Sequence, residues 1–316
     1  MKAIGGFFGF ESEPGTGGEW HDTSVRYDCG RSAFRTLLGI IRPAKVFVPY
    51  YTCDALLQPL QILGIDYEFY GLDRQLEIAG EMNLRSGELL VYINYFGIKD
   101  GYCDRLVERY GNQVVLDNTM AFFYRNERPY WGFNSCRKFF GVPDGAYLSS
   151  PERIPDVCIT ASVNEFISTD FLFFRNEGLI HKGFELFKRN EEAFGNSVHA
   201  MSRFTHSVMS GFNYGNARAF RRANFDFLHR ILKGSNGLEF EGVFDGALYY
   251  PYFSPDSPEH ALFWDRDIFV PRLWTECLKR GEGFGWEKEL STHLIPIPID
   301  HRYTPSDLER ILTLIL

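Results

Sequence analysis

The stretch ELLVYINYFGIKDGYCDRLVERYGNQVVLDNT, residues 88–119, decides the expected fold. An apolar run at 88–97 is followed by a segment with helical spacing at 104–111 and by a second apolar run at 112–119. Two buried strands joined by a helix are typical of a βαβ unit, in which the strands run parallel in one sheet. The second run ends in Asp117, so we expect this carboxylate at the carboxyl end of a strand.

The same alternation continues on both sides of this unit. Residues 24–30, 45–50, 65–73 and 146–150 have the composition of strands, and residues 31–41 and 53–64 have the apolar spacing of helices. The pattern predicts an α/β fold, with a mostly parallel sheet that carries helices on both faces. We place this large domain at residues 21–165, after a Gly-rich N-terminal arm, residues 1–20, that packs on a neighbour.

The remainder of the chain divides into two parts. Residues 166–235 read as a helical connecting region, and its charged stretch FKRNEEAFGN, 187–196, is interpreted as solvated helix faces. The sequence pattern of residues 236–316 predicts a smaller C-terminal α+β domain with strands at 247–253 and 294–300. Helices are expected there at 271–280 and 306–316, the second capped by Ser306.

Composition excludes several classes of protein. The 316 residues carry a net charge of −8 and no basic run, which argues against a general nucleic-acid binder. No apolar run approaches the roughly 18 residues of a membrane span, and the N-terminus does not resemble a signal peptide. The six cysteines form no CxxC pair, which favours reduced thiols in a cytoplasmic protein, and no histidine spacing supports a metal site.

Ligands of parallel sheets bind beyond the carboxyl ends of the strands, which directs attention to a few positions. Arg31, Ser32 and Ala33 begin a helix after a strand, where free N–H groups favour a phosphate; the alternative is an ordinary N-cap serine. The residues Thr52, Cys53 and Asn94 also follow predicted strands. Asp117 could keep a pyridine nitrogen protonated, or it could only form an Asx turn.

The segment FNSCRKFFGVPDG, residues 133–145, carries the candidate nucleophile. It places Lys138 between Ser135 and the apolar pair Phe139 and Phe140. Apolar neighbours favour the neutral amine that Schiff-base chemistry needs, although most lysines are solvated and this one could point outward. A phosphate-binding helix start, an aspartate at a strand end and then a lysine follow the order found in pyridoxal-phosphate (PLP) enzymes of the aspartate-aminotransferase type.

Several motifs resemble the DegT–StrS family of PLP-dependent sugar aminotransferases. They are GRSAF, VPYYTCDALLQPL, NYFG, VVLDNTMAFF, SCRKFFGVPDGAYL and IPIDHRYTPSDLERIL. The resemblance implies PLP-transferase fold type I, Lys138 as the lysine bound to PLP and Asp117 as the partner of the pyridine nitrogen. It also implies a phosphate site near Ser32, Ala33 and Ser135, with Thr52 and Cys53 beside the ring.

The chain departs from the family pattern in three respects, one of which is that the family's serine lies further ahead of the lysine than Ser135 does. Met120 stands where the family carries a glutamine that faces the phenolic oxygen of PLP, and Cys53 stands where a bulky ring stacks on the cofactor. The family also takes an asparagine from the neighbouring subunit for the phosphate, and Asn213 is the candidate here.

The resemblance implies an aminotransferase that acts on a nucleotide-linked keto-sugar in surface polysaccharide biosynthesis. Glutamate is the expected amino donor, and a homodimer with a shared active site is the expected assembly. Because Met120 and Cys53 depart from the family, a PLP-dependent lyase or dehydratase and a non-catalytic relative are alternatives.

Overall fold

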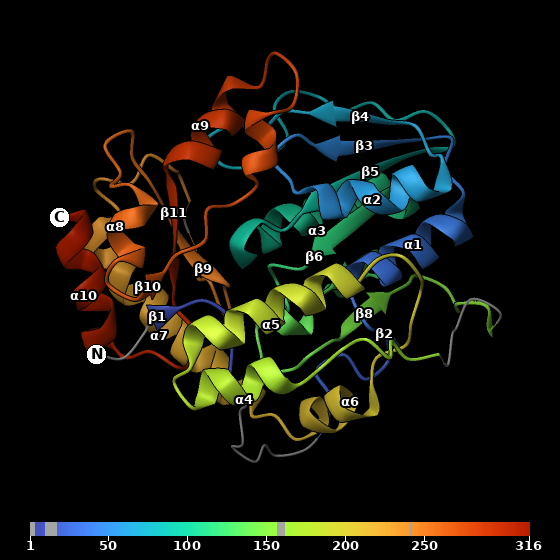
Figure 1. Ribbon diagram of the computed structural model, residues 1–316. Helices are drawn as coiled ribbons and strands as arrows, with labels where there is room; N and C mark the ends of the chain where they lie inside the picture. Colours follow the sequence, from blue (N-terminus) through green and yellow to red (C-terminus); the bar gives the residue numbers. More distant parts are fainter. Residues whose placement is uncertain (1–3, 10–17, 157–161, 241) are drawn as a thin grey trace.

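A seven-stranded sheet lies at the centre of the molecule in the computed structural model, which describes residues 4–9, 18–156, 162–240 and 242–316 (Figure 1). The strand order is β2-β8-β7-β6-β5-β3-β4. Neighbouring strands from β7 to β4 pair in parallel, and β8 runs antiparallel to both β7 and β2. The strands are β2 (Val25–Tyr27), β3 (Lys45–Pro49), β4 (Tyr67–Tyr70), β5 (Glu88–Ile93), β6 (Val114–Asn118), β7 (Trp131–Asn134) and β8 (Ala146–Ser149).

Helices flank this sheet, as the alternating pattern predicts. Helix α1 (Gly30–Ile41) packs against β7 and β8 and lies beside α2 (Asp54–Leu63), while α3 (Asp100–Tyr110) packs against β6. Every residue of β6 is buried, and only the first residue of β5 is not. A parallel strand covered on both faces needs such a continuous apolar run, so the central expectation from residues 88–119 is confirmed.

The helical region after the sheet contains four helices among the residues described. They are α4 (Asp170–Asn176), α5 (Ile180–Ala193), α6 (Arg203–Ser210) and α7 (Tyr214–Leu232). Helices α4 and α5 lie side by side, and Figure 1 shows α7 reaching the C-terminal strands. The predominantly helical character expected between the sheet and the C-terminal part is therefore present.

The C-terminal part combines short strands with helices. Strands β9 (Tyr249–Phe253) and β11 (Leu294–Pro298) pair antiparallel, in agreement with the sequence pattern. The remaining elements there are α8 (His260–Trp264), β10 (Ile268–Phe269), η5 (Thr275–Leu278), α9 (Gly285–His293) and α10 (Pro305–Ile315).

Two local expectations in the C-terminal part are wrong. The helix expected at 271–280 is only the 3₁₀ turn η5, because Trp274 has a left-handed backbone (φ 51°) and packs edge-on against Tyr51, 4.4 Å between ring centroids. The N-cap of α10 is Thr304 rather than Ser306. Thr304 forms a capping box with Asp307, and Pro305 occupies the first helical position between them.

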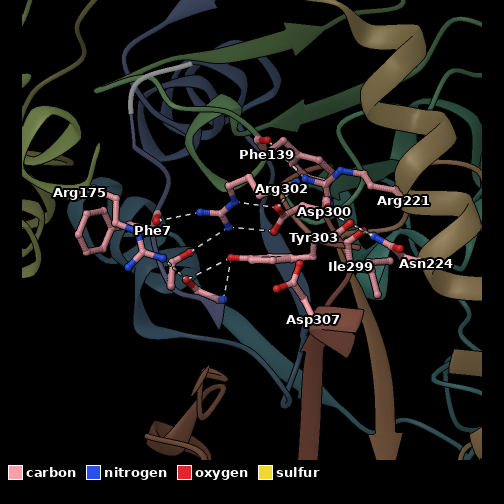
Figure 2. Close-up of polar contacts among 12 residues, drawn as sticks. Phe7, Phe139, Arg175, Arg221, Asn224, Ile299, Asp300, Arg302, Tyr303 and Asp307 are labelled. Carbon is pink, nitrogen blue, oxygen red and sulfur yellow. Dashed lines mark hydrogen bonds and ion pairs between the residues drawn. The ribbon is translucent and has the colours of Figure 1, made fainter. Parts of the chain in front are cut away.

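Residues 4–9, the first described part of the expected N-terminal arm, pack on the C-terminal region of the same chain. Strand β1 (Ile4–Gly5) pairs in parallel with β10. The N–H of Gly5 donates to the Tyr303 hydroxyl at 2.7 Å, and Arg302 Nη1 donates to the Phe7 carbonyl at 3.0 Å. Figure 2 shows Arg302 between Phe7 and the Asp300 carboxylate.

Asp300 is the buried acceptor of this cluster. Its side chain is 6% exposed and accepts from Arg302 Nε at 2.7 Å and Nη2 at 2.9 Å. Burial alone raises the pKa of this carboxyl, but Arg302 and then Arg221 lower it by more, so the net pKa lies well below the ordinary range. Asp300 lies between the two guanidinium groups in Figure 2.

We expect Asp300→Asn to lower the free energy of unfolding by about 3 to 5 kcal/mol, because it leaves buried guanidinium charge uncompensated. The native pKa is depressed, so the contribution of Asp300 is present above the unfolded-state value of about 3.9 and is lost as pH falls through the native pKa. Urea unfolding at pH 7 and at progressively lower pH measures both effects. The exposed Asp256→Asn is the matched control, and an equal loss in both variants would contradict the prediction.

The described cysteines are unpaired. Cys29, Cys53, Cys103, Cys136 and Cys277 carry free thiols, while Cys158 lies outside the described residues.

Candidate active site

A cavity of about 310 Å³ lies beyond the carboxyl ends of β3, β6 and β7. Asp117 reaches it from β6, Ser135 and Lys138 from the turn after β7, and Cys53 from the start of α2. Arg31, at the start of α1, also lines the cavity. The structure therefore brings together residues that are as many as 107 positions apart in the sequence and that the sequence analysis singled out separately.

Asp117 and Lys138 are linked through Thr119. The Lys138 ammonium donates to Thr119 Oγ1 at 3.1 Å, and the N–H of Thr119 donates to Asp117 Oδ1 at 2.9 Å. The hydrogen bond from the Thr119 N–H to Asp117 is the Asx turn that the sequence analysis gave as the alternative role of Asp117. The turn is present, and the same carboxyl also lines the cavity, so one role does not exclude the other.

The surroundings of Asp117 change its acidity. The residue is 6% exposed, and this burial raises the pKa of its carboxyl above the ordinary value. The nearby Lys138 charge and the hydrogen bonds from Thr119 act in the opposite direction but do not cancel the effect of burial. A raised carboxyl pKa beside an amine in a cavity is typical of sites that hold and transfer protons.

The turn that carries Lys138 is held from several directions. It contains η3 (Cys136–Lys138), and the N–H of Cys136 donates to the Gly145 carbonyl at 2.9 Å. Gly145 has φ +113°, and a Cβ there would lie 2.9 Å from Thr205 Cγ2, so only glycine fits. Asp144 accepts from the Ser202 N–H at 2.7 Å, which ties the turn to the start of α6.

The aromatic pair after Lys138 does not cover the amine. Phe139 and Phe140 are fully buried and pack against Phe122 in the interior. The Lys138 side chain is exposed instead. The apolar environment expected for Lys138 is therefore absent from this side, and its described hydrogen-bond partner is the Thr119 hydroxyl.

Other residues singled out from the sequence lie in different surroundings. Ser32 is buried and donates to the Ser197 carbonyl at 3.4 Å, and Ala33 is buried in α1. Asn94 donates to Asp100 at 2.7 Å, and Met120 is buried in the core. None of these four, nor Thr52, is among the described residues that line the cavity.

Thr52 and Asn213 have distinct local roles. Thr52 is buried, and within the described residues its hydroxyl has no hydrogen-bond partner. Asn213 is the N-cap of α7 and accepts from the Asn216 N–H at 3.0 Å. A role for Asn213 in a neighbouring subunit's site stays a prediction.

Sequence reasoning missed Arg137 and Glu191, which also line the cavity. The carboxylate of Glu191, in α5, forms an ion pair with Arg137 and lies 3.8 Å from Arg31 Nη2. Burial raises the pKa of Glu191, but the two arginines lower it by more, so the net pKa is below the ordinary value. The interpretation of 187–196 as solvated faces does not foresee this ion pair, because Arg137 is 54 residues away from Glu191 and no local pattern connects them.

A larger groove of about 630 Å³ lies elsewhere, between the segments that precede β2 and β7. Its arginines are engaged nearby: Arg128 with Glu108 at 2.9 Å and Arg153 with Asp156 at 3.0 Å. It lacks a lysine among its described lining residues, so the smaller cavity is the better candidate for amine chemistry.

Comparison with known proteins gives a fold match without a sequence match. No family model matches the chain, and no curated protein sequence matches it significantly. Among solved structures, GDP-4-keto-6-deoxy-D-mannose-3-dehydratase from E. coli, with bound hydrated PLP, has a TM-score of 0.63 at 11% identity, covering 93% of this chain and 87% of that chain.

Two aminotransferase structures are similar to the same extent. A DegT DnrJ EryC1 StrS aminotransferase from Brucella abortus has a TM-score of 0.60 at 13% identity, covering 92% of this chain and 84% of that one. Sugar aminotransferase CalS13 from Micromonospora echinospora has a TM-score of 0.57 at 13% identity, and the match covers 93% of this chain and 86% of the CalS13 chain. The chain therefore has the fold of these enzymes, and the fold expected from the motif resemblance is confirmed.

We expect Asp117→Asn to raise the melting temperature at pH 7, because it removes a carboxylate that burial destabilises. The native pKa is raised, so wild type becomes protonated and regains this stability as pH falls through that pKa. The advantage of the variant should therefore be largest near neutral pH and shrink toward acid pH. Thermal melts of both proteins across this range measure it, and a variant less stable at every pH would contradict the explanation.

Proposed function

We propose that this protein is a PLP-dependent aminotransferase that acts on a nucleotide-linked keto-sugar. The observation that supports the proposal most strongly is the pairing of Lys138 and Asp117 in one cavity, each in contact with Thr119. A free amine and a buried carboxylate on neighbouring segments are the groups that PLP chemistry requires. The shared fold with PLP-containing and sugar-modifying enzymes adds to this support.

The residues present fit PLP. Lys138 offers a primary amine inside the cavity, and Asp117 offers a buried carboxyl whose ionised form needs a positive partner. The start of α1 has no acidic residue in its first turn, which leaves its N–H groups and positive dipole end available to a phosphate. Ser135, Arg31 and Arg137 also line the cavity.

The role of each residue follows from its surroundings. When bound, PLP supplies an electron sink for the carbanion formed beside an amino group. Asp117 would hold the ring nitrogen in its protonated form, because a positive charge there compensates the buried carboxylate. Lys138, exposed to the cavity, would remove and return the proton at its Nζ atom. Thr119 orients both groups through its hydroxyl and its N–H.

The finer assignments also belong to this proposal. Glutamate as amino donor and a place in surface polysaccharide biosynthesis follow from the motif resemblance. A cytoplasmic location follows from the cysteines, which form no CxxC pair and suit reduced thiols. Among the described helices, each is too short or too polar to cross a bilayer.

A homodimer is proposed as the assembly. Phe173 on α4, Phe184 on α5 and Phe204 on α6 are each at least 40% exposed, and large exposed aromatic side chains are enriched at subunit interfaces. Light scattering after size-exclusion chromatography would give twice the monomer mass.

We expect purified protein with PLP to absorb in the visible range through the cofactor bound to Lys138. Lys138→Ala should lose this band and reduce turnover by about 10²- to 10⁴-fold, because the variant lacks both the covalent attachment and the proton-transferring amine. Lys188→Ala, which removes an exposed lysine of α5, is the matched control. An intact band in Lys138→Ala would remove the central assignment.

Glutamate distinguishes transamination from the alternatives. In an aminotransferase, glutamate alone should convert the visible band to that of pyridoxamine phosphate and release 2-oxoglutarate. Met120 and Cys53, at positions where the family carries other residues, make a lyase or dehydratase the second candidate. That enzyme would retain its band with glutamate and change it only with a sugar substrate, and a non-catalytic protein would do neither.

A further inference from the structure

Two arginines share one carboxylate at the edge of the cavity. Arg137 Nη1 contacts Glu191 Oε1, and Arg31 Nη2 lies 3.8 Å from Glu191 Oε2. Arg31 belongs to the first turn of α1, whereas Arg137 immediately precedes Lys138 in η3. The cluster therefore joins the start of the helix to the turn that carries the candidate nucleophile.

The cluster has more donors and more positive charge than one carboxylate can satisfy. Two guanidinium groups face a single carboxylate, which leaves one positive charge in excess. The side chains of Arg137 and Arg31 are 13% and 19% exposed, so water compensates this charge poorly. The Nε atom of Arg137 is buried and, in the part of the chain that the structure describes, has no acceptor.

The carboxylate is the most exposed member of the cluster. The Glu191 side chain is 38% exposed, about twice the fraction of Arg31. Its backbone is held, because the Glu191 carbonyl accepts from Arg31 Nη2 at 3.3 Å and the Asn196 carbonyl accepts from Arg35 Nη1 at 3.1 Å. The carboxylate can therefore leave the arginines by rotation of its side chain, while α5 stays in place.

We propose that Arg31 and Arg137 form a clamp for a phosphate monoester, and that Glu191 is a built-in counter-ion displaced when the phosphate binds. A phosphate dianion would neutralise both guanidinium groups and offer oxygens to their remaining donors, including Arg137 Nε. The inference rests on the proposed function in one respect: the phosphate is taken to be that of PLP. Glu191 then lowers the affinity for the phosphate, because its ion pairs with the two arginines must break before the phosphate can bind them.

The test compares PLP with pyridoxal, which has the same aldehyde and ring but no phosphate. Dissociation constants are measured from the absorbance of wild type, Arg137→Gln, Glu191→Gln and the neighbouring exposed control Glu192→Gln. We expect Arg137→Gln to weaken PLP binding about 10- to 100-fold and to leave pyridoxal unchanged, as for the loss of a hydrogen bond to a charged group. Glu191→Gln should tighten PLP binding several-fold, and Glu192→Gln should change neither ligand.

Inorganic phosphate supplies a readout that does not need the cofactor. It should compete with PLP but not with pyridoxal, and at constant ionic strength it should raise the melting temperature of wild type and Glu191→Gln but not of Arg137→Gln. If Arg137→Gln does not fold, two measurements still test the clamp. They are the PLP affinity of Glu191→Gln and the competition between inorganic phosphate and PLP in wild type.

The outcomes separate the clamp from the proposed function. PLP binding that neither Arg137→Gln nor Glu191→Gln alters overturns the clamp and leaves the function intact. Weaker PLP binding in Glu191→Gln also overturns it, because the carboxylate would then organise the site rather than compete for it. A phosphate effect lost in Arg137→Gln, without visible PLP binding to wild type, supports the clamp and refutes the function. The assignment to the cofactor's phosphate is overturned if Arg137→Gln binds a nucleoside diphosphate more weakly than wild type does but binds PLP equally well.

Discussion

The parallel pairing of β6 with β7 is the constraint on which the candidate site depends. Asp117 pairs with Phe133 in this ladder, and Asn118 with Asn134, so both strands end at the same edge of the sheet. The turn with Lys138 begins just beyond that edge. Because side chains alternate between the two faces of a strand, a shift of the register by one residue would move Asp117 away from the cavity.

The site is obtained at some cost to stability, and the rest of the fold compensates for it. An ionised Asp117 at a buried position opposes folding, because burial disfavours its charged form. Close by, Phe122, Phe139 and Phe140 form a buried aromatic cluster with favourable edge-on and tilted contacts. The aromatic residues after Lys138 therefore anchor the turn in the protein interior, and they do not cover the Lys138 amine.

Distant parts of the chain meet at the same turn. Arg221, fully buried in α7, donates to the Phe139 carbonyl at 3.4 Å (Figure 2). It also donates to the Ala247 carbonyl at 3.1 Å, which connects the turn with the segment before β9. Asp144 connects it with α6. The position of Lys138 is thus set by the helical region and the C-terminal part together, and not by the sheet alone.

The sequence by itself determined the parallel sheet, the strand-end position of Asp117 and the lysine in the next turn, because burial and strand endings leave a local pattern of apolar residues. It could not reveal the contact of Glu191 with Arg137 and Arg31, or the left-handed Trp274 that replaces the expected helix. Those features arise between residues far apart in the chain, where charge pairing and ring packing decide the outcome. Only the tertiary structure brings the partners together, so only it could show which of the strand-end residues share a cavity.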